Sequence, residues 1–218
     1  MRPRPADSDA LRQQRRVLEL RAKLHAAIRC FFVERGFLEV TTPLILPANA
    51  PETHIDAIAA GTGWLRTSPE LAMKRLLAAG HEAIFQLGPC FRAGEQGRWH
   101  HPEFMMLEWY RAPAGYLDIL ADTKALLAFV TTELRGGTDF SWQGKSLSCA
   151  QDMWEKYTVS QAFIQFAGWD PAVRFDADRF DLDLVTRVEP GLPMDRPVVL
   201  LDYPTPQASL ARRKPDDP

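Results

Sequence analysis

The sequence predicts an α+β fold, in which helices and antiparallel hairpins are mixed without a regular βαβ alternation. Apolar residues recur every three or four positions over residues 9–35, which is the helical period. Two strand-like segments, 83–92 and 103–111, flank a polar loop and therefore predict a hairpin. Further helical patterns cover residues 116–134, 158–166 and 175–188. Helices thus precede and follow the hairpin, as in an α+β domain.

Composition limits the classes of protein that this chain can be. Its 218 residues are 46% apolar and 25% charged, which is ordinary for a protein with a buried core. The formal net charge of −2 argues against binding nucleic acid mainly through phosphates, because that needs a clustered basic surface. The 3 cysteines form no Cys-x-x-Cys pair, and no apolar run approaches the ~20 residues of a membrane span. We therefore expect a cytoplasmic protein with no metal site on cysteine and no membrane partner.

The N-terminal region is expected to hold one long helix. Residues 1–8 are polar, contain two prolines and are predicted to be disordered. Asp9 is predicted to cap a helix that runs to about residue 35 and ends at Gly36. An apolar stripe on this helix is expected to face the core: Val17, Leu20, Leu24, Ile28 and Phe31. A dimer interface on the same helix is compatible with that core contact.

Shorter elements are expected after this helix. Strands are predicted at residues 37–40, 53–60, 64–67, 145–148 and 198–203. Ser68, Pro69 and Glu70 predict the start of a helix, because serine caps, proline fits the first position and glutamate favours the positive end. Lys74 and Arg75 are expected on the exposed face of that helix.

Side chains that could bind a ligand are concentrated in the hairpin, in the run FRAGEQGRWHHPEFMMLEWY over residues 91–110. Because side chains alternate along a strand, one face of its second strand holds Phe104, Met106, Glu108 and Tyr110. Burying Glu108 without a partner would cost several kcal/mol, so an incoming cation is expected to pair with it. Residues of the first strand that could lie beside this row are Gln86, Cys90 and Arg92.

The loop of the hairpin could bind a nucleotide. It holds the charged and imidazole side chains Arg92, Glu95, Arg98, His100 and His101. The planar fork of arginine bonds two phosphate oxygens at once, and a flat ring such as Phe104 can stack on a purine. One hairpin could therefore hold phosphate, base and a cationic substrate group. A solvated, charged hairpin loop without a ligand remains the alternative.

These residues also resemble a known family. Phe91-Arg92 and the His100–Phe104 segment resemble motif 2 of class II aminoacyl-tRNA synthetases, and residues 106–110 resemble its lysyl branch. Residues 67–76 and 208–213 are similar to further lysyl-type segments, and the helix ending at Gly36 is similar to motif 1, the family's dimer interface. The resemblance covers about residues 11–213. It implies an antiparallel sheet flanked by helices in a catalytic domain over residues 9–218.

Within the lysyl branch, the chain most resembles the elongation factor P β-lysine ligases, a group of lysyl-tRNA synthetase paralogs. The sequence starts directly at the motif 1 helix, and residues 107–111 read Leu-Glu-Trp-Tyr-Arg as in that group. The resemblance implies ATP-dependent activation of lysine or β-lysine as an adenylate and transfer to a lysine of elongation factor P. It further implies a homodimer, Mg²⁺ as cofactor and no tRNA partner.

The resemblance also assigns site residues. ATP would be bound by Arg92, Gly94, Glu95, His100, His101 and Phe104, and the amino acid by Ser68, Glu70, Glu108 and Tyr110. Arg92 would be the catalytic residue on the α-phosphate, and Phe104 would stack on adenine. Glu70 would take the α- or β-ammonium of the substrate, and Glu108 with Tyr110 its distal ammonium.

The sequence departs from the family pattern in two places. The acid usually found two positions after the motif 2 arginine is replaced by Gly94, and Glu95 follows it. The sequence also ends at Pro218, before the family's Mg²⁺-binding carboxylates and motif 3. We therefore expect this chain not to complete catalysis alone. A lysyl-tRNA synthetase fragment, or a non-catalytic paralog that binds a lysine-like ligand or partner protein, remains an alternative.

Overall fold

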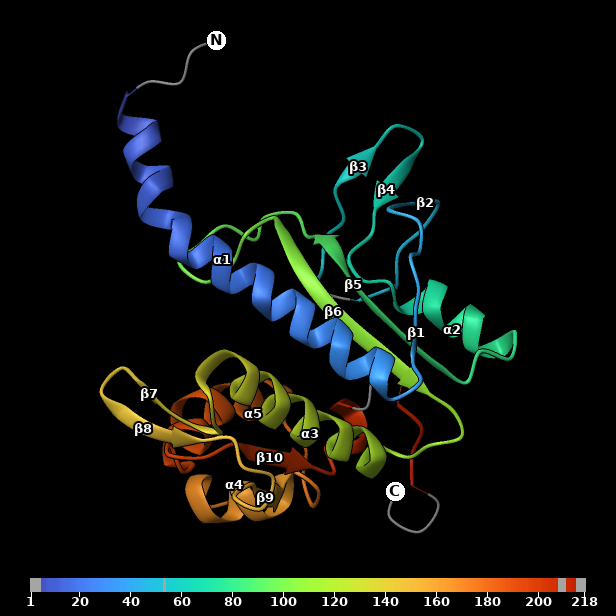
Figure 1. Cartoon of the computed structure of the whole chain (residues 1–218). Helices are drawn as coiled ribbons and strands as arrows, with labels where there is room; N and C mark the ends of the chain where they lie inside the picture. The colour runs from blue at the N-terminus through green and yellow to red at the C-terminus, as the bar shows by residue number, and fades with distance from the viewer. Residues whose placement is uncertain (1–4, 53, 208–210, 215–218) are drawn as a thin grey trace. The chain divides into compact units, whose positions relative to one another are not determined.

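The computed structural model describes residues 5–52, 54–207 and 211–214 (Figure 1). The chain divides into two compact units, Met1–Leu126 and Leu127–Pro218. Helices are combined with sheets that contain both parallel and antiparallel pairs, so the predicted α+β class is confirmed.

The first unit contains most of the predicted site. Its elements are α1 (Pro5–Glu34), β1 (Leu38–Glu39), β2 (Ile45–Leu46), β3 (Ala59–Ala60), β4 (Gly63–Leu65), α2 (Glu70–Ala78), β5 (Ala83–Phe91), β6 (Glu103–Arg111) and the start of α3 (Tyr116–Arg135). The hairpin of β5 and β6, green in Figure 1, confirms the predicted strands to within one residue. In this sheet β5 is antiparallel to β6 but parallel to β1, while β2, β4 and β3 form a separate antiparallel sheet.

The long helix α1 begins earlier than the sequence predicts. It includes residues 5–8, so the expectation of disorder there and of a cap at Asp9 is wrong, and residues 1–4 lie outside the described part. A proline is well tolerated in the first turn of a helix because its missing N–H would have no partner there. The predicted end is confirmed: Gly36 has a φ of +77° and donates its N–H to the carbonyl of Val33, while Phe37 donates to Phe32.

Only the second half of α1 packs into a core. Phe32 is fully buried and stacks on Phe85 of β5 with ring centroids 4.8 Å apart, and it also contacts Trp109 of β6 at 5.4 Å. Val17 is 63% exposed and Leu20 is exposed as well, so the predicted core-facing stripe is wrong for the first half. A helix of 30 residues is roughly 45 Å long, whereas the 9-residue strands span roughly 30 Å, so one end passes the sheet (Figure 1).

The short predicted strands are present with different limits. The prediction for residues 37–40 corresponds to β1, that for 64–67 to β4, and the end of 53–60 to β3, while Thr53 lies outside the described residues. Strand β2 was not predicted. The segment at residues 208–213 has its first three residues outside the described part.

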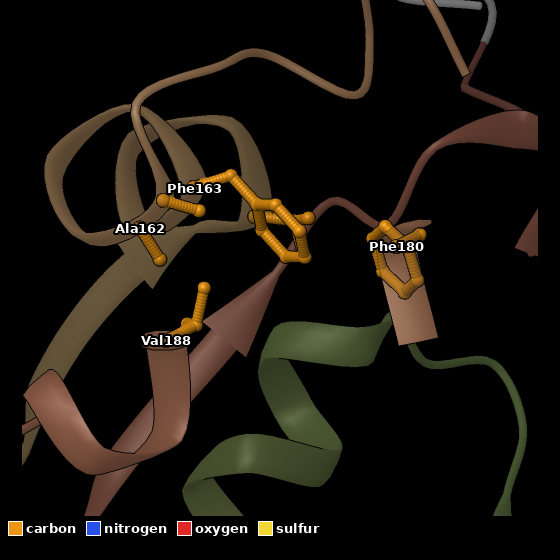
Figure 2. Packing of buried hydrophobic residues seen from close by; sticks show 6 residues of the cluster. Ala162, Phe163, Phe180 and Val188 are labelled. Atoms are coloured by element: carbon orange, nitrogen blue, oxygen red, sulfur yellow. The ribbon is translucent and has the colours of Figure 1, made fainter. Parts of the chain in front are cut away.

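The second unit has its own core. After the end of α3 its elements are β7 (Asp139–Trp142), β8 (Lys145–Ser148), β9 (Glu155–Thr158), α4 (Val159–Ala167), α5 (Ala177–Asp183), a π-helical turn η1 (Leu184–Val188), α6 (Glu189–Gly191), β10 (Val198–Leu201) and a 3-10 turn η2 (Thr205–Gln207). Phe163 of α4 stacks on Phe180 of α5 at 4.7 Å, and Val188 closes the same cluster (Figure 2). The predicted helices at 158–166 and 175–188 and the strand at 145–148 are thus confirmed, whereas β7 and β9 were missed.

Gly88 of β5 marks a close approach inside the first unit. A Cβ on this residue would lie 2.7 Å from Nη2 of Arg66, whose guanidinium is fixed by hydrogen bonds to the backbone. We expect Gly88→Ala to lower the free energy of unfolding by about 1–3 kcal/mol, the usual cost of overpacking a buried site. Gly97→Ala is the control, because a Cβ there has nothing within 4 Å. Equal urea unfolding curves for both variants would contradict the prediction.

Candidate functional site

The predicted site residues of the hairpin lie on one face of β5 and β6. Glu108 is paired with Gln86 in the register, and Phe104 is paired with Cys90. Paired residues point to the same side of a sheet, so the expected neighbourhood of these four side chains is confirmed. The β6 residues of this face are half-buried, whereas Gln86 and Cys90 are buried. The face therefore offers partly accessible side chains along β6.

One end of this face is acidic. Tyr110 donates its hydroxyl to Oε1 of Glu108 at 2.6 Å. Burial raises the pKa of Glu108, and the neighbouring charge of Glu70 raises it further, while Tyr110, Lys74 and Arg66 act in the opposite direction. Burial and the bond to Glu108 together raise the pKa of Tyr110 well above its ordinary value. Among the described residues no cation lies within ion-pair distance of Glu108, which therefore can accept one.

The start of helix α2 brings a second carboxylate to this end. Glu70 is the first residue of α2, one position later than a serine cap predicts, and its N–H donates to the hydroxyl of Ser68 at 3.4 Å. Lys74 donates its ammonium to Oε1 of Glu70 at 2.5 Å. Ser68 therefore supports the helix start in this structure, and Glu70 is already paired with a cation of the same helix.

The other end of the face holds Arg92. The guanidinium of Arg92 lies over the ring of Phe104 at 5.2 Å, and its Nη1 is 3.7 Å from Oε1 of Glu95. Its Nε is buried and has no hydrogen-bond partner in the part of the chain that is described. Buried donors are nearly always satisfied in proteins, so this one calls for an acceptor such as a phosphate oxygen.

The loop between the strands is held by its backbone. Arg92 donates its N–H to the carbonyl of Pro102 at 2.9 Å, and Ala93 donates to Asp56 at 2.8 Å. Gly94 adopts a φ of +73°, a conformation that suits glycine and turns the chain away from the strand. His100 and His101 are exposed, so the structure groups Arg92, Glu95 and Phe104 but leaves both imidazoles in solvent.

Sequence reasoning missed buried polar residues that lie beside this face. Arg66 is only 1% exposed and donates to the carbonyl of Thr42 at 3.0 Å, to its hydroxyl at 2.9 Å and to the carbonyl of Pro89 at 2.9 Å. Asn49 accepts from the N–H of Thr67 at 3.0 Å and so holds the segment before Ser68. The sequence did offer one indication of Arg66, which is an arginine within a predicted strand. A guanidinium is buried only where hydrogen-bond partners surround it.

No three His, Cys, Asp or Glu side chains of the described residues gather closely enough to hold a metal ion by themselves. In the second unit, a hollow of about 490 Å³ is lined by Lys156, Tyr157, Gln161, Ile164 and Gln165, and none of the predicted site residues is among them. Within the same described ranges, no helix combines the length and apolar character needed to cross a bilayer.

Several known proteins are similar to this chain. The family model for tRNA synthetases class II (D, K and N) matches residues 4–218. The chain is 32% identical to a lysine–tRNA ligase of Chromohalobacter salexigens over 94% of its length. It is 33% identical to an elongation factor P–(R)-β-lysine ligase of Proteus mirabilis over 90% of its length, and 36% identical to one of Vibrio cholerae over 92%.

The same matches cover only part of the relatives. The chain spans 46% of the length of the Chromohalobacter protein, 65% of the Proteus protein and 66% of the Vibrio protein. Every residue of the hairpin site lies inside the range that the family model matches.

Proposed function

This chain belongs to the class II tRNA synthetases (D, K and N), and from that membership we propose that it activates a lysine-type amino acid with ATP. The activated acyl group is then passed to a lysine of elongation factor P. The names of the relatives support a lysine-type substrate. The observation that carries the proposal is the half-buried carboxylate of Glu108, which forms no ion pair within the described part of the chain and lies at the opposite end of the face from Arg92.

The acidic end of the hairpin face suits a diamine. Glu108 and Tyr110 bind the distal ammonium, because a buried carboxylate gains most from a cation that arrives with the substrate. Glu70, beside Ser68, binds the second ammonium, since it faces the same cluster. The substrate carboxylate then points away from both acids and towards the arginine end.

The arginine end suits ATP. Arg92 binds the α-phosphate with its unpaired Nε, and Phe104 stacks on adenine. Gly94, Glu95, His100 and His101 line the loop around the phosphates and base. The substrate carboxylate attacks the α-phosphorus, pyrophosphate leaves, and the acyl-adenylate remains. A lysine amine of elongation factor P then attacks the acyl carbon, and AMP leaves.

These steps require no side chain as a nucleophile. The chain's own residues orient the two substrates and offset the charge that develops on the phosphorus, which is the main source of catalysis in this kind of transfer. Mg²⁺ would be held mainly by the phosphates of ATP, because the described residues offer no cluster of three ligands for it, and it would neutralise phosphate charge.

The proposal is tested by ATP–pyrophosphate exchange with lysine, (R)-β-lysine, aspartate and asparagine in parallel. Exchange with the two lysine-type substrates alone supports it, and equal exchange with aspartate would refute the lysine assignment. A lysine–tRNA ligase is the second candidate, because the Chromohalobacter relative matches 94% of the chain. Transfer of labelled lysine to elongation factor P or to tRNA separates the two candidates.

We further propose that α1 forms a homodimer interface. Phe31 and Phe32 are both fully buried, so they are not available for such a contact. Large apolar side chains of α1 that are exposed among the described residues are Leu11, Val17, Leu18, Leu20 and Val33. A two-fold contact that covers them would remove this apolar surface from water.

Sedimentation should therefore show a dimer at micromolar concentration. Leu18→Glu should shift the protein towards monomer, because it places a charge inside the contact. Leu182→Glu is the control, since Leu182 is similarly exposed but belongs to α5. A monomeric unaltered protein, or equal effects of both substitutions, would contradict the proposal.

A further inference from the structure

The ion pair of Lys74 and Glu70 lies at the acidic end of the site. Lys74 and Glu70 are one helical turn apart on α2, and 43% and 20% of their side chains are exposed. A surface pair of this spacing is usually worth little and is fully solvated. Glu70 is instead half-buried, and its charge reaches Glu108 and Tyr110 on β6.

The charges of this cluster do not balance once a diamine binds. The empty site has two carboxylates, Glu70 and Glu108, which repel each other, while the ammonium of Lys74 and the buried guanidinium of Arg66 oppose that repulsion. A lysine-type substrate brings two further ammonium groups. Glu70 would then hold the ammonium of Lys74 and the first ammonium of the substrate together, and these two like charges repel each other.

We propose that Lys74 is the resident cation of the empty site and that the first ammonium of the substrate displaces it from Glu70. This inference rests on the proposed function, in which Glu70 and Glu108 bind the two ammonium groups. Lys74 can leave at little cost, because its four-carbon stem is flexible and its head group is already partly in water.

The displacement favours diamines over other amino acids. An amino acid with one ammonium displaces Lys74 from Glu70 but leaves Glu108 without a cation. A diamine places one ammonium beside each carboxylate, and the new ion pair at Glu108 offsets the loss of the pair between Lys74 and Glu70. Lys74 thereby lowers the binding affinity for every amino acid. The affinity for diamines remains the highest, because only they pair with both carboxylates.

The test is the dissociation constant of L-lysine and (R)-β-lysine, measured by calorimetry on the full chain at about pH 8.5, where carboxyl groups are ionised. Lys74→Met should tighten the binding of both by about two- to fivefold, the range for losing a weak competing ion pair. Lys74→Arg keeps the charge and should bind like the unaltered protein. Arg75→Met is the matched control, since it removes the neighbouring exposed charge of α2.

A pH series and a second genetic background add two further readouts. Groups that face Glu108 are Tyr110 of β6, Glu70 and Lys74 of α2, the buried Arg66 and Cys90 of β5. Lys74 is one of the groups that lower the pKa of Glu108, so its loss should move the acid limb of lysine binding to higher pH. In a Glu70→Gln background, Lys74→Met should no longer tighten binding.

Weaker or unchanged binding by Lys74→Met would mean that Lys74 only holds Glu70 in place, and the inference would be overturned while the proposed function stands. Tightening that persists in the Glu70→Gln background would also overturn it. If the unaltered protein binds neither lysine nor β-lysine, the proposed function and this inference fail together.

Discussion

In a version of the protein extended to the full length of its relatives, replacing Arg92 by alanine is expected to reduce lysine-dependent ATP–pyrophosphate exchange by about 100- to 1000-fold, the usual effect of removing one charge-stabilising donor. The guanidinium lies over Phe104 and keeps a buried Nε without a partner among the described residues, so it is positioned for a ligand. Its ion pair with Glu95 spans 3.7 Å, which is longer than a good hydrogen bond. The fold should therefore survive the substitution.

Two further variants sharpen this prediction. Arg92→Lys should recover only part of the exchange rate, because an ammonium cannot bond two phosphate oxygens as the planar fork does. Arg75→Ala should leave the rate unchanged, since Arg75 lies on the exposed face of α2. Thermal melting of each variant checks the fold. An exchange rate of Arg92→Ala within about threefold of the unaltered protein would rule out its assigned role.

The second large effect is expected at Glu108. Glu108→Gln keeps the shape of the side chain and removes its charge, so the distal ammonium of the substrate loses its partner in a half-buried place. We expect lysine affinity to fall about 100-fold or more, since breaking such a pair costs a few kcal/mol. ATP affinity should stay within about twofold, because Phe104 and Arg92 lie at the other end of the face.

Calorimetry with each ligand separates these two effects. Tyr110→Phe should weaken lysine binding less, because it removes one hydrogen bond of 2.6 Å and leaves the charge. Glu82→Gln, an exposed acid before β5, is the control. Intact lysine binding in Glu108→Gln would remove the basis for a lysine-type substrate, even though the family membership would stand.

The raised pKa of Glu108 gives this binding a pH dependence of known sign. A protonated carboxyl cannot pair with an ammonium, so lysine affinity should rise as the pH increases through the raised pKa of Glu108. It should fall again where the ligand's own ammonium groups lose their protons, the α-ammonium first and the distal ammonium near about pH 10. In Glu108→Gln the acid limb should disappear. An acid limb that persists in that variant would assign the titration to another group.

The sequence predicted the hairpin best, because two independent patterns agree there. Strand alternation placed Glu108 and Phe104 on one face, and the polar loop between the strands marked the turn. The limits of α1 were predicted less well. An apolar period shows which face of a helix is apolar, but Val17 is exposed because the neighbouring sheet does not extend that far. How far the sheet extends depends on tertiary packing, which the apolar period of the helix does not show.

Residues that act through long-range contacts were the ones missed. Arg66 bonds Thr42 and Pro89, which lie 24 and 23 positions away, so no local pattern could pair them. Strand β1 runs parallel to β5 although the two are far apart in the chain, and only the folded structure reveals that pairing. The internal pairing of Glu70 with Lys74 was equally unforeseen, because the same spacing is typical of ordinary exposed helix faces.

The pairing of β5 with β6 also limits where residues can be inserted into or deleted from this chain. Each strand has 9 residues, and alternate positions of β6 face either the ligand side or the aromatic core around Phe32. Deleting or inserting a single residue within β6 would send Glu108 into that core and Trp109 out to solvent. Length variation should therefore be tolerated at residues 94–101, where it preserves the alternation, and should abolish folding within the strands.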